Sequence, residues 1–198
     1  MNTDQVIAFF IFAVVACWTP GPSNVLLTAT GTNVGVLRGL PALFGISFGI
    51  GLMMFLVVFG IGELILDNPR ALEILKWIGI AFILLLAWKI ATAGRVENGS
   101  REKPVGFFGA AAFQWVNPKS WVVCSSAAAT YLQADASEAI IQALSLGGIF
   151  IVVSLPCCFP WLAFGAVMRR YLKSDWAMRS FNVSMGGLLV ASLALIVF

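Results

Sequence analysis

The sequence predicts an all-α integral membrane protein in which six transmembrane helices form two inverted three-helix halves. Three observations predict this fold. Of the 198 residues, 60% are hydrophobic and 11% are charged, whereas a soluble domain carries about 25% charged residues. Six apolar segments are long enough to span a bilayer. Two of these segments are interrupted by prolines at corresponding positions, so helices 1 and 4 are expected to be broken near the bilayer midplane.

This composition excludes several classes of protein. A soluble chain of this size cannot bury so much apolar surface, which excludes a soluble enzyme, a nucleic-acid-binding protein and a disordered chain. There is no histidine, which is the commonest metal ligand. The four cysteines form no CxxC pair. We therefore expect no bound metal, no cofactor and no enzymatic activity.

Each apolar segment approaches or exceeds the roughly 20 residues that a helix needs to cross the hydrocarbon core. The segments run over residues 6–29, 40–66, 72–93, 106–130, 139–168 and 180–198. The fifth contains Pro156 and Pro160, which predict a tilt or a kink. The connections are short, so we expect one transmembrane domain over residues 1–198, with halves of approximately 1–95 and 104–198.

Positively charged residues gather in the odd-numbered connections. These residues are Arg38 in the first connection, Lys89, Arg95, Arg101 and Lys103 in the third, and Arg169, Arg170, Lys173 and Arg179 in the fifth. The second connection has only Arg70 and Lys76. Because Lys and Arg stay on the cytoplasmic side of a membrane, the odd connections are expected inside the cell. Both termini are then extracytoplasmic in a multi-pass protein.

The first segment is interrupted by residues 19–24 (TPGPSN) and the fourth by residues 117–119 (NPK). Prolines within a helix leave backbone polar groups unpaired. Such groups are tolerated in the bilayer core only where they are buried in protein or line a water-filled cavity. For either break taken alone, a structural kink remains the alternative interpretation.

The two breaks occupy equivalent places if the chain consists of two halves. Three spans per half is an odd number, so the second half would be inverted and the first and fourth spans would be equivalent. An offset of 97 residues pairs Trp18 with Trp115 and Ser23 with Ser120, and it aligns the breaks. Discontinuous helices in corresponding positions are typical of inverted-repeat transporters, whose substrate site lies between them near the midplane.

Lys119 lies near the middle of the fourth span. An ionisable residue at that depth indicates function by default. The nearest acidic residues, Glu63 and Asp67, lie toward a membrane end, which leaves room for an anionic ligand. Two alternatives stay open, namely a lysine neutralised by burial and a lysine paired with a backbone carbonyl.

The polar groups at the breaks suit a zwitterion. Ser23 or Asn24 is expected to cap a half-helix, and a helix N-terminus attracts a carboxylate. Carbonyl groups near Trp18 and Thr19 can accept from an ammonium group, and Asn117 can both donate and accept. The predicted substrate-binding residues are Trp18, Thr19, Pro20, Gly21, Pro22, Ser23, Asn24, Asn117, Pro118 and Lys119.

Gly45 and Gly49 form a GxxxG pattern in the second segment, which permits close approach of two helices. Packing within the chain is one use of this pattern, and a homodimer face is the other.

Four motifs in order along the chain carry a family resemblance. They are TPGP at 19–22, the glycine ladder through Gly49, LKWIG at 75–79 and NPK at 117–119. The chain resembles the LysE/RhtB-type amino-acid exporter family (lysine exporter / homoserine-threonine efflux type) over essentially its whole length. This resemblance implies export of amino acids or close derivatives across the bacterial cytoplasmic (inner) membrane by proton antiport. Phe82 and Ile83 stand where the family commonly has Tyr-Leu, and Ala87 where glycine is frequent, so the substrate is not named.

Two other classes remain as alternatives. A membrane thiol-redox protein of the DsbD/CcdA type also has six spans in inverted halves, and residues 156–160 (PCCFP) fit a PCxxP pattern. In that class, however, the reactive cysteines lie within such a motif in the first and fourth spans. Here Cys17 and Cys124 lie in those spans without it. The second alternative is a passive pore or a lipid-binding membrane protein.

Overall fold

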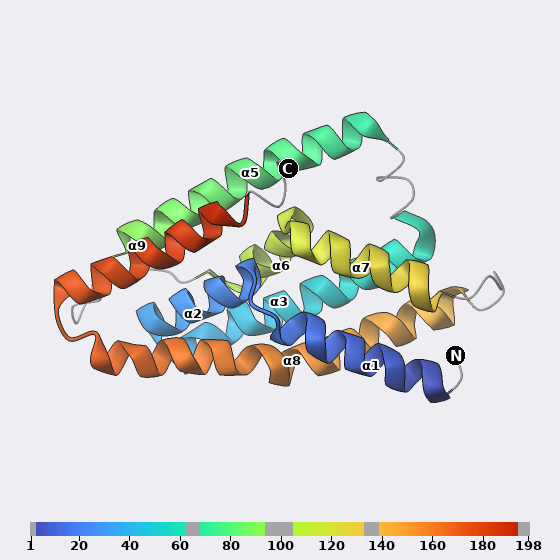
Figure 1. Cartoon of the computed structure of the whole chain (residues 1–198), viewed down its shortest axis with the longest axis horizontal. Coiled ribbons are helices and arrows are strands. Elements are labelled where there is room, and N and C mark those ends of the chain that lie inside the picture. The colour runs from blue at the N-terminus through green and yellow to red at the C-terminus, as the bar shows by residue number, and fades with distance from the viewer. Residues whose placement is uncertain (1–2, 62–67, 94–104, 133–138, 194–198) are drawn as a thin grey trace.

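The computed structural model describes residues 3–61, 68–93, 105–132 and 139–193 (Figure 1). Every regular element in these ranges is helical. The elements are α1 (Thr3–Trp18), α2 (Pro22–Val34), α3 (Val36–Leu56), η1 (Val57–Ile61), α5 (Pro69–Thr92), α6 (Phe107–Val116), α7 (Pro118–Tyr131), α8 (Ala139–Tyr171) and α9 (Asp175–Ala191). The expected all-α class is confirmed.

Three stretches of helix among the described residues are long and apolar enough to cross a membrane. They are Val36–Gly60, Glu73–Thr92 and Ala139–Tyr171. The pair α1 and α2 also passes this test when taken together, with a bend of 54° at the break. Helices α6, α7 and α9 are shorter, with 10, 14 and 17 residues. The predicted membrane protein is therefore supported by the length and composition of its helices.

The first two segments are joined more tightly than predicted. The sequence suggested a connection between residues 29 and 40, but α2 runs to Val34 and α3 begins at Val36. The threonine hydroxyls do not interrupt this helix, because those of Thr30 and Thr32 are satisfied by carbonyl groups one turn earlier, at 2.7 and 2.9 Å. Gly35 alone makes the turn, with a φ of 80° that favours glycine.

The last two helices also differ from the predicted segments. Helix α8 runs without interruption through Pro156 and Pro160 over 33 residues. Helix α9 begins at Asp175, five residues before the predicted start, because the Ser174 side chain caps its first turn by accepting from the Ala177 amide. The predicted segment ends at 66 and 198 lie outside the described residues.

Glycines bring the central helices into backbone contact. A Cβ atom on Gly165 of α8 would lie 2.0 Å from the Thr28 carbonyl oxygen of α2. One on Gly45 of α3 would lie 2.2 Å from the Phe107 oxygen, and one on Gly49 would lie 2.8 Å from Ala111 Cα. The GxxxG pattern therefore packs against α6 within the chain, which is the first of its two predicted uses.

Helices α5 and α9 form a pair along one side of the bundle (Figure 1). Outside the pair, α9 packs mainly against α2 and α5 against α6. Asn182 of α9 is fully buried and joins three helices. Its amide nitrogen donates to the Ala93 carbonyl after α5 at 2.9 Å and to Asn33 Oδ1 of α2 at 3.2 Å.

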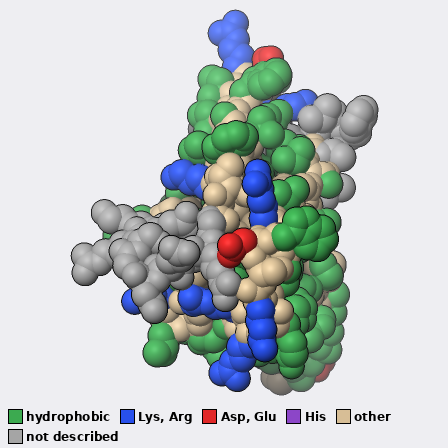
Figure 2. All heavy atoms as spheres, turned by 90° about the vertical axis from the view of Figure 1, so that its left-hand side faces the viewer, with side chains coloured by type: hydrophobic (Ala, Val, Ile, Leu, Met, Phe, Trp, Pro, Cys, Tyr) green, Lys and Arg blue, Asp and Glu red, His purple; other side chains and the backbone are tan. Residues whose placement is uncertain are grey.

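Lys and Arg side chains gather at one end of the molecule (Figure 2). This end holds the start of α3, the end of α5 and the link from α8 to α9 (Figure 1). Its basic residues are Arg38, Lys89, Arg169, Arg170, Lys173 and Arg179. The helices thus bring these described basic residues of the first, third and fifth connections together, and α1 begins at the opposite end.

Candidate functional site

Both predicted breaks exist as interruptions between helices. Helix α1 ends at Trp18 and α2 begins at Pro22, with Gly21 as the N-cap residue. The prediction that Ser23 or Asn24 caps this half-helix is wrong. Pro22 fits the first helical position because the missing N–H would have no intrahelical partner there, and this places both polar residues inside the first turn.

The second break is a single residue. Helix α6 ends at Val116, α7 begins at Pro118, and Asn117 between them caps α7. The Asn117 side chain accepts a hydrogen bond from the Lys119 amide at 3.1 Å. This cap fixes the direction in which the Lys119 side chain leaves the helix.

Lys119 joins the two breaks. Its ammonium group donates to the Thr19 carbonyl oxygen. Its aliphatic stem crosses Gly21, where an added Cβ atom would lie 2.8 Å from Lys119 Cδ. Of the alternatives left open by the sequence, the structure shows the lysine that pairs with a backbone carbonyl, and that carbonyl belongs to the other break.

Asn24 shares the same acceptor. Its side chain is 3% exposed, and its amide nitrogen donates to the Thr19 oxygen at 3.0 Å and to the Cys17 oxygen at 3.3 Å. The carbonyl groups near Trp18 and Thr19 are the acceptors that the sequence predicts for a substrate ammonium group. In this structure, groups of the protein occupy them.

A third polar residue, Gln114 of α6, forms hydrogen bonds to side chains at both breaks. It is fully buried. Its amide nitrogen donates to Ser23 Oγ at 3.1 Å, and its oxygen accepts from Ser120 Oγ at 2.7 Å. Asn117 Nδ2 also donates to Ser23 Oγ, at 3.0 Å. Sequence reasoning missed Gln114, although a lone amide side chain inside an apolar ten-residue helix was a usable signal.

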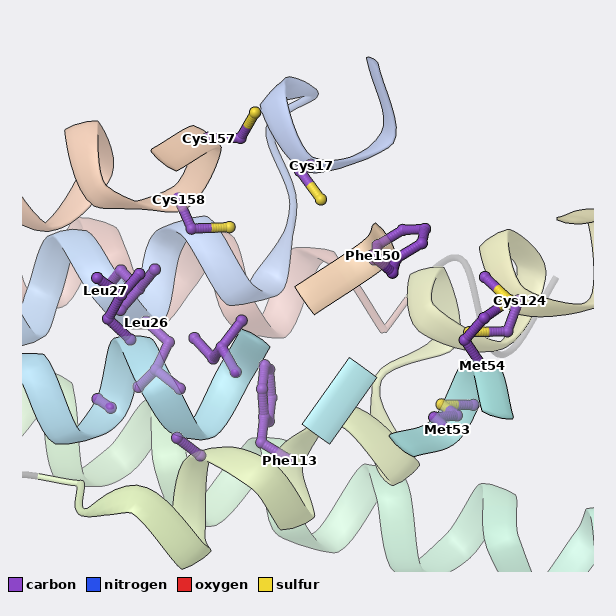
Figure 3. Close-up of a cluster of buried hydrophobic side chains, with 14 of the residues drawn as sticks. Cys17, Leu26, Leu27, Met53, Met54, Phe113, Cys124, Phe150, Cys157 and Cys158 are labelled. Atoms are coloured by element: carbon purple, nitrogen blue, oxygen red, sulfur yellow. The ribbon is translucent and has the colours of Figure 1, made fainter. Parts of the chain in front are cut away.

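These groups surround a cavity of about 30 Å³, which has room for roughly two water molecules. Its polar lining residues are Ser23, Asn24, Gln114, Asn117, Lys119, Ser120 and Ser154. Its other lining residues include Cys17, Phe150 and Cys158, which Figure 3 shows among the buried side chains. The lining therefore offers polar groups for charged atoms and apolar groups for a short side chain.

The remaining predicted residues lie differently. Gly21, Ser23, Asn24, Asn117 and Lys119 line the cavity. Trp18 is 55% exposed, Pro20 is also exposed, and the Thr19 hydroxyl donates to the Val15 oxygen of its own helix at 2.6 Å. Pro22 is buried and Pro118 half-buried, and both begin helices. The prolines shape the breaks, whereas the side chains beside them line the cavity.

The comparison with protein families gives a match across the site and nearly the whole chain. The profile described as LysE type translocator matches residues 13–197. The chain belongs to the LysE type translocator family. It is thus an efflux transporter and not an enzyme, which confirms the family that the motifs indicated and favours it over the thiol-redox alternative.

Relatives of this LysE-family chain occur in bacteria. The chain is 30% identical over 194 residues to proteins named cysteine/O-acetylserine efflux protein from Escherichia coli strain K12 and Shigella sonnei strain Ss046, with 96% of each sequence covered. No solved structure matches the chain.

Proposed function

We propose that this protein exports an amino acid or a close derivative across the bacterial inner membrane in exchange for protons, and that the substrate binds between the two breaks. One observation carries this proposal. The Lys119 ammonium group of one break donates to the Thr19 carbonyl group of the other, and Lys119 lines a cavity that has both polar and apolar lining residues.

Cysteine and O-acetylserine, for which the relatives are named, indicate the substrate class. Both are zwitterions with a short side chain, and the cavity lining offers polar groups for the charged atoms and apolar groups for the side chain. A cavity with room for roughly two water molecules has to widen to admit an amino acid. We infer that the substrate displaces Lys119 from Thr19 as it enters.

This displacement explains how proton and substrate exchange. The substrate ammonium group and the Lys119 ammonium group are chemically alike, so they compete for the same carbonyl oxygens. The substrate carboxylate would lie at the N-terminus of α2, next to Gly21 and Ser23, where a helix attracts anions. Substrate binding is then coupled to loss of the Lys119 proton, because a lysine can give up its charge where an arginine cannot.

A transport cycle follows from this competition. On the cytoplasmic side, the substrate ammonium group takes the Thr19 carbonyl oxygen, and Lys119 releases its proton into the cell. On the outer side, a proton binds Lys119, which returns to Thr19 and expels the substrate. One proton enters for each zwitterion that leaves.

Helix contacts support the inverted halves that such a cycle requires. We assign α1–α2, α3 and α5 to the first half, and α6–α7, α8 and α9 to the second, within one domain over residues 1–198. Equivalent helices would meet at a two-fold axis, and α3 packs against α8 as α5 does against α9. Six spans with both termini outside would place the basic end of Figure 2 in the cytoplasm.

The two halves differ in how tightly their second half-helices pack. Helix α2 packs closely along α8, whereas its counterpart α7 makes little contact with α3. In the proposed orientation, α2 lies on the cytoplasmic side and α7 on the outer side. This arrangement corresponds to a transporter closed toward the cytoplasm. In the inward-open state, α7 would pack closely on α3 and α2 would separate from α8.

A transport panel in proteoliposomes tests this function. Vesicles with an acidic lumen drive protons outward, so an antiporter should accumulate labelled cysteine or O-acetylserine, while leucine and lysine enter poorly. A protonophore should abolish accumulation. Failure of every small polar amino acid to move would reject the substrate class, and accumulation that ignores the pH gradient would reject antiport.

A further inference from the structure

Two thiol groups at the cavity come from different helices. Cys17 belongs to α1 and Cys158 to α8, and both line the cavity. Helix α1 packs along α8, so the two thiols belong to neighbouring helices at one cavity. They are 8% and 3% exposed, so a reagent reaches them only through the cavity.

The other two cysteines do not share this position. Figure 3 shows the Cys157 thiol pointing in a different direction from that of Cys158, and Cys157 does not line the cavity. Cys124 is fully buried on α7 and also lies outside the cavity lining. All four cysteines are free thiols. The chain thus contains its own controls for a thiol reaction at the cavity.

We propose that Cys17 and Cys158 form a modification site for small-molecule disulfides, which convert the pair to a disulfide and lock the transporter. The proposal rests on the proposed function, because the reagent enters through the cavity when it opens for substrate. The resulting bond would tie α1 to α8 beside the break. Lys119 and the substrate could then no longer exchange at Thr19.

The reaction is a thiol–disulfide exchange in two steps. One protein thiolate attacks the reagent R–S–S–R, forms a mixed disulfide and releases one RSH, which takes the proton of the attacking thiol. The second protein thiol attacks the mixed disulfide and releases the second RSH. Two electrons pass from the protein pair to the reagent. The thiolate is the attacking form, and Lys119 in the same cavity can serve as its counter-ion.

Cystine is the probe for the test. Proteoliposomes that contain the wild-type protein are treated with cystine, the remaining thiols are blocked with N-ethylmaleimide, and the digested protein is examined by mass spectrometry. Transport is followed with labelled O-acetylserine, which has no thiol group to reverse the reaction. We expect a peptide pair linked through Cys17 and Cys158, loss of transport to the level of empty liposomes, and recovery with dithiothreitol.

Single variants show which thiols are required. For Cys17→Ser and Cys158→Ser, transport after cystine is compared with transport of the same variant before treatment, and we expect no loss. The matched controls Cys124→Ser and Cys157→Ser should remain sensitive. The proposal is overturned if wild type forms no link between Cys17 and Cys158, if the linked protein still transports, or if Cys17→Ser remains sensitive. The peptide mapping tests for the link between Cys17 and Cys158 even if O-acetylserine proves not to be the substrate.

Discussion

At the scale of single residues, Gln114 holds the site together. It is fully buried and bonded to Ser23 of one broken helix and Ser120 of the other. A buried polar group that loses its partner costs about 1–3 kcal/mol. Leucine at this position would fill a similar volume but remove the Gln114 partner of both serines, and Ser23 would keep only the bond from Asn117.

We therefore predict that Gln114→Leu lowers stability by about 1–3 kcal/mol, measured as thermal unfolding in detergent, and also weakens substrate binding. Thr92→Val is the control, because the Thr92 hydroxyl is exposed and donates only to the Trp88 oxygen of its own helix. Equal unfolding temperatures for Gln114→Leu and wild type would contradict the role given to this network.

The residues of the site could be predicted from the sequence only where they carry a local signal. Proline, glycine and a charge in an apolar run identified the breaks and Lys119. Cys17 and Cys158 carry no such signal, because a thiol inside an apolar helix resembles any small core residue. Trp18 was assigned to the site for its position beside the break, but the bend turns it outward. The sequence also could not show that Lys119 reaches across to Thr19.

At the scale of helices, the length of the apolar runs located the main elements well. The boundary between α2 and α3 was missed because threonine and glycine in residues 28–35 resemble a polar loop. In the folded chain the threonine hydroxyls bond to backbone carbonyls, and Thr32 also donates to the Gly165 oxygen of α8 at 3.0 Å. Tertiary contacts thus stabilise a helix that composition disfavours.

The contact between α2 and α8 gives a prediction for glycine. Gly165→Ala would place a Cβ atom 2.0 Å from the Thr28 oxygen, so α2 must move away from α8. We expect a loss of stability of about 1–3 kcal/mol. We also expect loss of transport, because the side that is cytoplasmic in the proposed orientation would no longer close.

Gly148→Ala is the matched control on the same helix, because nothing lies within 4 Å of its Cβ position. Alanine there should be neutral or stabilising by about 0.5–1 kcal/mol. Thermal unfolding and transport are measured on both variants. Wild-type transport by Gly165→Ala would show that closure of α2 on α8 is not needed.

At the scale of the whole molecule, the distribution of charge predicts orientation. The basic end of the molecule contains residues from three connections that are far apart in the sequence (Figure 2). Regions rich in Lys and Arg stay on the cytoplasmic side of a membrane. Alkaline phosphatase fused after Phe198 should therefore be active, because it folds only outside the cytoplasm. Green fluorescent protein fused at the same place should be dark. The reverse pattern would reject the orientation and the proposed direction of closure.

The central claim is that Lys119 exchanges a proton for the substrate at Thr19. Proteoliposomes with a pH-sensitive dye inside, given labelled O-acetylserine, report proton and substrate movement together. Wild type and the exposed control Lys89→Ala should couple the two fluxes. Lys119→Ala should let substrate equilibrate but neither accumulate it on a pH gradient nor move protons. Lys119→Arg should transport little, because arginine keeps its charge. If Lys119→Ala is folded and still accumulates substrate on a pH gradient as wild type does, Lys119 is not the exchanging group.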